Sequence, residues 1–391
     1  MHLIIYRKQN EYMIYLDNAS TTKPSEAVKK AVMEAMESFG NPSSMHRLGI
    51  DAENIIKKAK ENASKVLGVA AKDIYFTSGG TESNNTAILG YCRKNAKKGR
   101  HIITTKVEHP SVLVPFKILE DEGFSVTYLD VDEKGVISIE DFSDALCEDT
   151  IFVSVMLVNN EVGSIMPVDK LKPLMREKSP KAVLHVDAVQ GFGKVMCKPS
   201  LWGVDMLSAS GHKIHAIKGC GILYIADKVN LSPLINGGGQ QKDIRSGTEN
   251  VVGIAALSKA CEEIVNYKSE YVKSLRERLK GEILENIENV KINEADKDSQ
   301  AGHILNVSIL GVKAEILLHS LEMHEVYVST GSACSTNKPM PSHVLTAMGC
   351  DKAQIEGAIR FSLSENLSEK DIDTAVGALV KETAQIRKYV R

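Results

Sequence analysis

The sequence predicts an α/β protein in which helices cover both faces of a mostly parallel sheet, followed by a smaller α+β unit. Three observations predict this class. Short apolar runs alternate with helical patterns from about 21 to 230, the pattern becomes almost purely helical from 251 to about 290, and a further extended run and helical stretch follow. Strands that alternate with helices are typical of parallel sheets, because a crossover helix connects neighbouring parallel strands.

The elements of the first unit follow from hydrophobic periodicity. Apolar residues recur at helical spacing over 27–39, after Pro24, which suits the first turn of a helix. Helical character returns at 86–97 and 168–177. The short apolar runs expected to form strands are 74–76, 102–105, 126–129, 151–158, 183–186 and 222–225.

The second unit begins with a segment rich in Lys and Glu over 251–290. We expect one long helix that crosses into a second domain there, rather than a coiled coil. An extended run at 304–309 and a helical C-terminal stretch complete this unit. The predicted large domain therefore covers 21–253, and the small domain consists of 1–20 and 254–391.

Composition excludes several classes of protein. The 391 residues include 48 Lys and Arg against 50 Asp and Glu, a formal net charge of −2, with 43% hydrophobic residues. These are ordinary values for a folded soluble protein. No basic excess is available to neutralise phosphates, so we expect no direct nucleic-acid partner. The apolar run at 3–6 is too short for a signal peptide, and nothing approaches a membrane span, so the expected location is the cytoplasm.

The chain has seven cysteines, and none of them form a C-x-x-C pair. That pattern indicates neither a disulfide framework nor a zinc site, and the H-E-x-x-H metalloprotease motif is also missing, so no metal is expected. Cys92 and Cys261 lie in helical patterns and Cys220 in a strand pattern, which favours packed thiols. Cys334 differs because it follows small residues and precedes an irregular loop at 335–341.

Turns rich in Gly, Ser and Thr follow several predicted strands, where open α/β sheets bind their ligands. The turn at 77–85 opens a helix, so its backbone could hold an anion such as phosphate, although a plain N-cap turn has the same pattern. Asp187 ends a buried strand. Its carboxylate needs a cationic partner, which is either a salt-bridging side chain or the protonated ring nitrogen of a cofactor.

Lys213 follows small hydroxyl residues after another apolar run. Most lysines are solvated surface charges, but an amine in this position can form an imine if its pKa is lowered. An anion site, a carboxylate for a pyridinium nitrogen and an imine-forming amine, in this order, are what pyridoxal 5′-phosphate requires.

At this point the sequence resembles the cysteine desulfurases of the class V aminotransferase superfamily, pyridoxal-phosphate enzymes of fold-type I. The resemblance extends over nearly the whole chain, in the order of the family. The matching segments are 15–19, 39–44, 77–85, 108–109, 159–163, 185–190, 210–213, 245–248, 329–334, 341–345 and 359–362.

The resemblance implies a role for each matching residue. Lys213 would hold the cofactor as a Schiff base, Asp187 would pair with the pyridinium nitrogen, and His109 would stack on the ring and transfer protons. Thr248 would reach the phosphate of a neighbouring subunit, which implies a homodimer. Arg360 would bind the substrate carboxylate, a role suited to its planar guanidinium. The remaining cofactor contacts would be Asn160 and Gln190 at the ring substituents and Gly80, Thr81, Ser210 and His212 at the phosphate.

The implied activity is the removal of sulfur from L-cysteine, which leaves L-alanine and a persulfide on Cys334. An acceptor protein would then take the sulfur, for example an iron–sulfur cluster scaffold, a tRNA-thiolation enzyme or a thiamine synthesis protein. The alternative is a selenocysteine lyase or another class V aminotransferase-like enzyme. The cysteine loop argues against a plain aminotransferase, and the presence of both Lys213 and Cys334 argues against a catalytically silent scaffold.

The chain departs from the family pattern in two places. Ala216-Ile217-Lys218-Gly219 stands where many members have Gly-Pro-Lys-Gly, so the turn after the lysine is expected to differ in shape. The segment 18–24 carries one extra residue before its proline. Met13 matches the usual start of the family, which leaves 1–12 as an extension.

Overall fold

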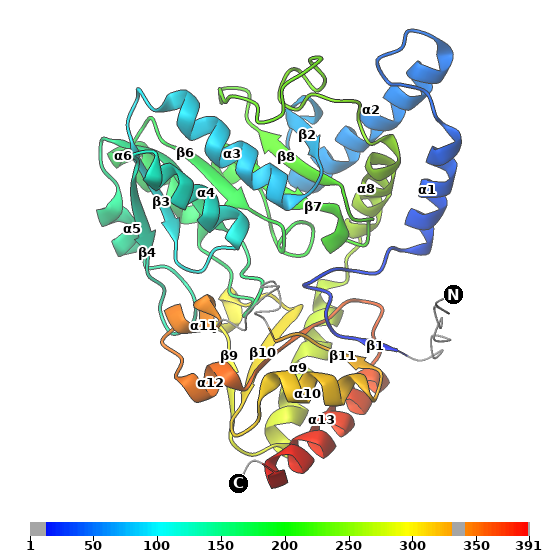
Figure 1. Ribbon diagram of the computed structural model, residues 1–391, viewed down its shortest axis with the longest axis vertical. Coiled ribbons are helices and arrows are strands. Elements are labelled where there is room, and N and C mark those ends of the chain that lie inside the picture. The colour runs from blue at the N-terminus through cyan, green and yellow to red at the C-terminus, as the bar shows by residue number, and fades with distance from the viewer. Residues whose placement is uncertain (1–12, 331–340, 390–391) are drawn as a thin grey trace, which may run out of the picture.

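The computed structural model describes residues 13–330 and 341–389. Figure 1 shows a large sheet with its helices in the upper part of the molecule and a smaller group of strands and helices below it. The predicted fold class is confirmed, because the large sheet is mostly parallel and the lower unit mixes α and β elements.

The large sheet has seven strands in the order β2-β8-β7-β6-β5-β3-β4. From β7 through β6, β5 and β3 to β4 all neighbours are parallel, whereas β8 is antiparallel to both β7 and β2. Each predicted strand is present, and the sheet has one further strand at 206–210, directly before the turn that contains Lys213. The strands are β2 (Ile74–Thr77), β3 (His101–Thr105), β4 (Ser125–Leu129), β5 (Thr150–Met156), β6 (Val183–Asp187), β7 (Met206–Ser210) and β8 (Gly221–Ile225).

Helices cover both faces of this sheet because side chains of successive strand residues point to opposite sides. Phe152 and Val183 pack with α3 and α4 in one apolar cluster, whereas Val153 and Leu184 pack in the cluster on the other face. The helices of this unit are α1 (Glu26–Glu37), α2 (Arg47–Leu67), α3 (Gly80–Asn95), α4 (Pro110–Asp121), α5 (Ile139–Ala145), α6 (Leu171–Lys178), α7 (Pro199–Trp202) and α8 (Val251–Ile264).

The prediction of a single helix over 251–290 is wrong, because the chain forms α8 and a separate α9 (Ser269–Asn286). Between them, the N–H groups of Asn266 and Tyr267 donate to carbonyls three residues back, which tightens and ends α8. The side chains of α8 join the core of the large sheet, whereas those of α9 join the core of the smaller unit. The predicted boundary at 253 stays a prediction, while the apolar core changes between 264 and 272.

The smaller unit is built on a three-stranded antiparallel sheet in the order β12-β10-β9. Its strands are β9 (Val290–Asn293), β10 (Ile304–Ile309) and β12 (Ala358–Ser362), and a parallel pair joins β1 (Ile14–Tyr15) to β11 (Val326–Tyr327). Besides α9, its helices are α10 (Ala314–Glu322), α11 (His343–Ala347), α12 (Lys352–Glu356) and α13 (Glu369–Tyr389). The start of the described chain therefore lies in the smaller unit, beside residues near its end (Figure 1).

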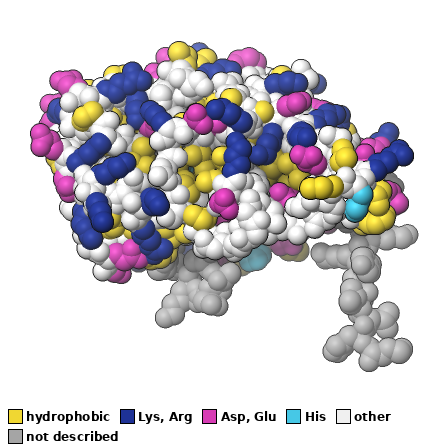
Figure 2. Space-filling model, turned by 90° about the horizontal axis from the view of Figure 1, so that it is seen from above, with side chains coloured by type: hydrophobic (Ala, Val, Ile, Leu, Met, Phe, Trp, Pro, Cys, Tyr) yellow, Lys and Arg dark blue, Asp and Glu magenta, His cyan; other side chains and the backbone are white. Residues whose placement is uncertain are grey.

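The surface agrees with the balanced composition. Figure 2 shows basic and acidic side chains interspersed over the upper face, with apolar side chains between them. Within 13–330 and 341–389, no helix combines the length and the apolar character needed to cross a membrane.

Candidate active site

A cavity of about 280 Å³ lies at the carboxyl ends of β6 and β7, where open α/β sheets bind ligands. Residues of the large unit line most of it, and Arg360 and Ser329 approach from the smaller unit. Of the site residues predicted from sequence, the cavity brings together Gly80, Thr81, His109, Asn160, Asp187, Gln190, Ser210, His212, Lys213 and Arg360. Thr248 does not line it and is exposed, and Cys334 lies outside the described residues.

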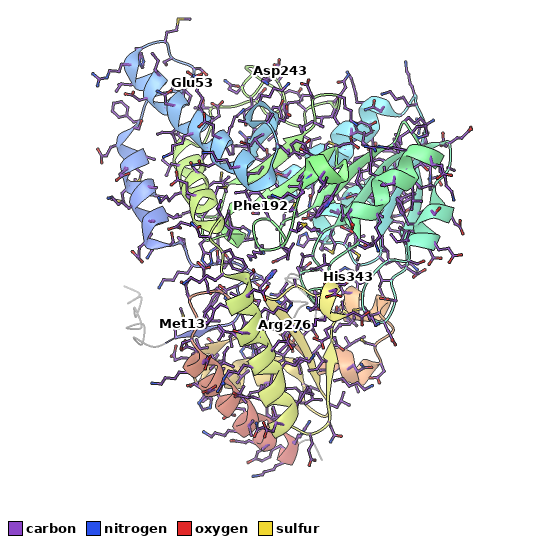
Figure 3. All side chains as sticks on the ribbon, turned by 180° about the vertical axis from the view of Figure 1, so that it is seen from behind. Met13, Glu53, Phe192, Asp243, Arg276 and His343 are labelled. Carbon is purple, nitrogen blue, oxygen red and sulfur yellow. The ribbon has the colours of Figure 1, made fainter. Side chains whose placement is uncertain are left out.

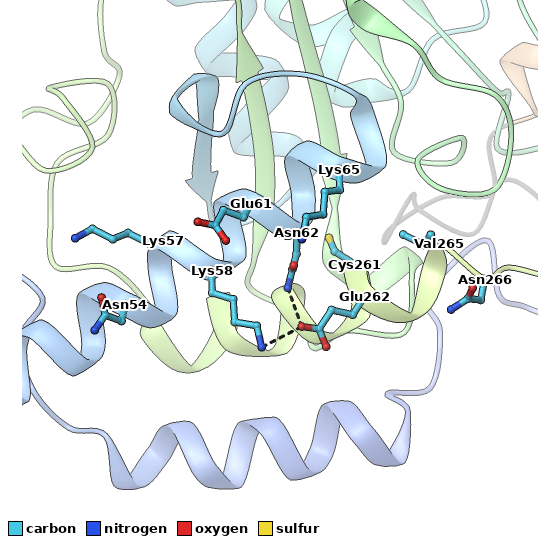
Figure 4. A pocket seen from close by; sticks show the side chains of 10 residues that line it. All are labelled: Asn54, Lys57, Lys58, Glu61, Asn62, Lys65, Cys261, Glu262, Val265 and Asn266. Atoms are coloured by element: carbon cyan, nitrogen blue, oxygen red, sulfur yellow. Dashed lines mark hydrogen bonds and ion pairs between the residues drawn. The ribbon is translucent and has the colours of Figure 1, made fainter.

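The cavity that contains the predicted residues is smaller than another cavity of the molecule. A cavity of about 670 Å³ lies between α2 and α8 (Figure 4). It contains none of the predicted residues. The Glu262 carboxylate is already satisfied there by the Lys58 ammonium at 3.1 Å and the Asn62 amide at 3.0 Å. We therefore assign the site by its chemistry, to the smaller cavity.

The anion end of the site is the N-terminus of α3. Gly79 precedes the helix and offers no side-chain cap, so the first N–H groups of α3 are available to a ligand. A Cβ on Gly80 would lie 2.6 Å from Cγ2 of Val189, so only glycine fits this position. Burial and the neighbouring Lys213 charge lower the pKa of His212 to about 4, so its ring is neutral at pH 7.

The carboxylate of Asp187 ends β6 and is 5% exposed. It accepts hydrogen bonds from the Asn84 amide at 2.7 Å and the Val189 N–H at 3.0 Å. Among the described residues Asp187 takes part in no ion pair within 4.0 Å. The structural salt bridge that the sequence left open is therefore not formed among these residues. A buried carboxylate without a cationic partner favours a cationic ligand.

His109 is oriented by a short polar chain that ends at Asp187. The Asn84 amide donates to the Ser111 hydroxyl at 2.9 Å, and this hydroxyl lies 2.8 Å from Nδ1 of His109. Nδ1 also accepts from the Ser111 N–H at 3.1 Å, as the N-cap of α4. Because Nδ1 is an acceptor, the proton of the neutral ring is on Nε2. Burial lowers the pKa of His109, although Asp187 opposes the shift.

Lys213 lies in a short turn directly after β7. Its ammonium donates to the carbonyls of Ala19 at 2.6 Å and Ser20 at 2.7 Å. The Gln190 amide donates to the same Ala19 carbonyl at 2.7 Å, and its own oxygen is buried without a partner among the described residues. The segment around Ala19 therefore covers the amine from the side of the smaller unit.

The turn after Lys213 has an unusual backbone. His215 has a φ of 67°, in the left-handed region, and its N–H donates to the Thr22 hydroxyl at 2.7 Å. Ala216 is buried and its N–H donates to the Gly211 carbonyl at 3.1 Å. Contacts to the N-terminal segment thus fix the turn in which this chain departs from the family pattern.

Arg360 reaches the cavity from β12 and is 3% exposed. Its Nη2 donates to the Asp17 carboxylate at 2.8 Å and to the Ser20 hydroxyl at 2.7 Å. Its Nη1 donates to the Asn160 carbonyl at 2.9 Å. Its Nε is buried and has no partner within the part of the chain that the structure describes. The guanidinium is therefore positioned in advance and retains capacity for another acceptor.

Sequence reasoning missed the residues that hold the predicted ones in place. Asn84 and Ser111 join His109 to Asp187, and Asp17 and Ser20 hold Arg360. A signal existed for Asn84, because it lies four residues after Gly80 and so on the same face of α3. Asp17 lies in the matching segment 15–19, but nothing in the sequence indicated its contact with Arg360, which joins distant parts of the chain.

Comparison with known proteins agrees with this geometry. The family model for Aminotransferase class-V matches residues 14–375, which is nearly the whole chain. A cysteine desulfurase IscS of Clostridium botulinum (strain Hall) is 41% identical over 381 residues, which cover 96% of this chain and 95% of that relative. The chain therefore belongs to the class V aminotransferase family and, within it, to the cysteine desulfurases.

Solved structures give the same result. A NifS-like protein matches with a TM-score of 0.89 and 35% identity, covering 96% of this chain and 100% of the other. A structure described as SspA in complex with cysteine matches with a TM-score of 0.80 and 33% identity, covering 90% of this chain and 99% of the other. The predicted resemblance is confirmed.

Proposed function

We propose that the cavity holds pyridoxal 5′-phosphate and that the chain uses it to remove sulfur from L-cysteine. The observation that carries this proposal is the meeting of Lys213, Asp187 and His109 with the uncapped N-terminus of α3 in one cavity. The similarity to a structure that contains cysteine supports the choice of substrate.

The residues present fit the cofactor at both of its ends. The α3 N-terminus, with Gly80 packed closely against Val189, and the nearby Ser210 suit a phosphate group. At the other end, Asp187 offers a buried carboxylate, without an ion pair among the described residues, to a protonated ring nitrogen. When bound, the cofactor supplies an electron sink that stabilises negative charge at the substrate Cα.

The protein groups supply binding and proton transfer. Lys213 is the amine that binds the cofactor and, once displaced by substrate, the base that removes the Cα proton. The carbonyls of Ala19 and Ser20 can receive its ammonium after that step. The neutral ring of His109 has its proton on Nε2, available to a reacting group. Arg360 binds the substrate carboxylate through its guanidinium.

The sulfur nucleophile is a cysteine thiolate, and we assign this role to Cys334. None of the described cysteines lines the cavity. Cys147 is exposed, but it precedes β5 at the opposite edge of the sheet. Burial raises the pKa of the other described thiols, which disfavours their thiolates; they are Cys92, Cys197, Cys220, Cys261 and Cys350.

We further propose that two copies form a homodimer in the cytoplasm and that an acceptor protein takes the sulfur. Thr248 is exposed and away from the cavity of its own chain, as expected of a residue that serves a neighbouring subunit. Apolar side chains are strongly exposed around the end of α1, notably Phe39 at 80% and Met45 at 97%. An apolar surface of this kind favours a protein partner. The acceptors to test are iron–sulfur scaffolds and tRNA-thiolation enzymes.

The experiment that tests the function combines the purified chain with pyridoxal phosphate, L-cysteine and dithiothreitol, and measures alanine. We expect alanine from the wild type and a persulfide on Cys334 in the mass spectrum before the reductant is added. Cys334→Ala should keep the cofactor absorbance and form no alanine. Alanine formation by Cys334→Ala would overturn its role, and turnover of selenocysteine alone would favour a selenocysteine lyase.

A further inference from the structure

A second cavity, of about 340 Å³, lies between the large and the small unit. Its lining on one side is the turn 193–196 after β6 and the end of α8, and on the other side the start of α9 and residues 300 and 302. It shares no lining residue with the active-site cavity. Figure 3 labels Phe192, which precedes this turn, and Arg276, which lies farther along α9.

Lys194 is the unusual residue of this cavity. It is 8% exposed, yet its ammonium makes no hydrogen bond or ion pair with any residue that the structure describes. Lys172 is buried to a similar extent but is paired with Asp205 at 2.5 Å and with the Ala182 carbonyl at 3.1 Å. Burial, together with the Lys213 charge, lowers the pKa of Lys194 to about 7. A buried amine without an internal counter-ion favours an anion from outside.

The start of α9 adds donors to the same cavity. Ser269 and Glu270 line it, and the preceding Lys268 gives the helix no side-chain cap. The Lys268 N–H already donates to the Glu365 carboxylate at 3.2 Å and the Ser269 N–H to the Tyr267 carbonyl at 3.0 Å, so the first turn beyond them supplies the donors that remain. Together with the positive end of the helix dipole, such N–H groups attract anions. Lys273, one turn along α9, also lines the cavity, whereas Glu270 is the acidic residue of the lining.

We propose that this cavity is a binding site for a small oxyanion, a carboxylate or a phosphate, held by Lys194, Lys273 and the N-terminus of α9. Such an anion contacts both units at once and stabilises their arrangement. The site shares no lining residue with the active-site cavity, although the Lys213 charge reaches Lys194.

The test uses the full-length enzyme loaded with pyridoxal phosphate, so that the phosphate position of the active site is already filled. Inorganic phosphate and succinate are titrated separately by calorimetry, with chloride at matched ionic strength as the reference. We expect saturable binding of at least one oxyanion and a rise in melting temperature. Lys194→Gln should weaken binding about tenfold or more, the effect of removing a charge-assisted hydrogen bond.

Matched variants keep the proposal falsifiable. Lys352→Gln, on an exposed lysine of α12, removes the same charge elsewhere and should leave affinity unchanged. Glu270→Gln, at an exposed position, should strengthen binding a few-fold, and Lys273→Gln should weaken it. Equal affinity for oxyanions and chloride, or unchanged affinity in Lys194→Gln, would overturn the proposal. If Lys194→Gln fails to fold, unchanged affinity in both α9 variants would do so.

Discussion

A buried aspartate lies at each end of the central strands of the large sheet, and the two differ in their partners. At the amino edge, Asp205 precedes β7 and is 1% exposed, and its carboxylate is paired with Lys172 at 2.5 Å and Lys228 at 2.9 Å. At the carboxyl edge, Asp187 ends the neighbouring strand β6 and is 5% exposed, with only an amide and a backbone N–H as donors among the described residues.

This difference separates structural from functional charge. Both aspartates bear the desolvation cost of burial, but only at the amino edge does the described chain supply cations within reach. At the carboxyl edge the described chain supplies no such cation, which is what the proposed binding of a cofactor with a protonated ring nitrogen requires. Substitutions at the two edges should therefore affect different measurements.

The largest effect is expected from the two lysines. Lys213→Ala removes both the cofactor amine and the base, so alanine formation should fall by about 10⁴-fold or more while the melting temperature stays close to that of the wild type. Lys172→Met leaves the buried Asp205 carboxylate with one partner fewer, so the free energy of unfolding of this variant should fall by about 3 kcal/mol. Its activity per folded molecule should stay unchanged. Urea unfolding and alanine assays on both variants would measure this. Equal losses of stability in Lys213→Ala and Lys172→Met would contradict the distinction between a functional lysine and a structural one.

The next effect is expected from the aspartates themselves. Asp187→Asn should lower kcat by about 10²–10³-fold, because the amide cannot stabilise the charge of a protonated ring nitrogen. Asp205→Asn should instead destabilise the fold, since two lysines lose their buried counter-ion. The absorbance spectrum of the bound cofactor and the unfolding midpoint would separate the two. An active Asp187→Asn enzyme would refute the cofactor role of this carboxylate.

A smaller effect is expected where substrate binds. Arg360→Gln removes two charge-assisted hydrogen bonds to a carboxylate, so KM for cysteine should rise roughly 100-fold. Asp17→Asn gives the matched test, because Asp17 accepts from the guanidinium at 2.8 Å and competes with the substrate. We expect a lower KM in Asp17→Asn, measured by initial rates. A higher KM would mean that the orientation of Arg360 by Asp17 outweighs this competition.

Much of the fold was predictable because apolar runs mark buried strands directly. The carboxyl edge was predictable as well, since Asp187 and Lys213 each follow such a run. The break between α8 and α9 was not, because it contains neither Gly nor Pro and results from the change of core.

Tertiary contacts explain the other gaps. Asn84 resembles any polar residue of an amphipathic helix until α4 brings Ser111 beside it. Asp17 becomes important only because β1 and β12 bring it to Arg360. Neither contact could be predicted from the sequence, because a local pattern does not indicate which distant residue a side chain will meet. The role of Cys334 stays a prediction, because that residue lies outside the described residues.

Between the two edges, the sheet interior should hold no charge, and His185 tests this. Its ring is fully buried in β6, with Nδ1 2.8 Å from the Ser154 hydroxyl and Nε2 2.9 Å from that of Ser208. Burial lowers the pKa of His185 to about 3, whereas an unfolded histidine titrates near 6.5. The unfolded chain therefore binds the extra proton, and stability falls as pH drops below about 6.5. At pH 5 this one ring should cost about 2 kcal/mol.

Other buried histidines add to the total slope, so the contribution of His185 is read from a difference. Burial also lowers the pKa of His101 and His303, which makes the wild type lose further stability over the same range. His185→Gln keeps a group that can bond to both serines but cannot titrate. Its free energy of unfolding should therefore decrease less between pH 7 and pH 5, by about 2 kcal/mol. His319→Gln, at an exposed position of α10, should follow the wild-type curve. Parallel curves for wild type and His185→Gln would mean that the ring binds its proton equally in the folded and the unfolded chain, and that the sheet interior accepts a charge without a counter-ion.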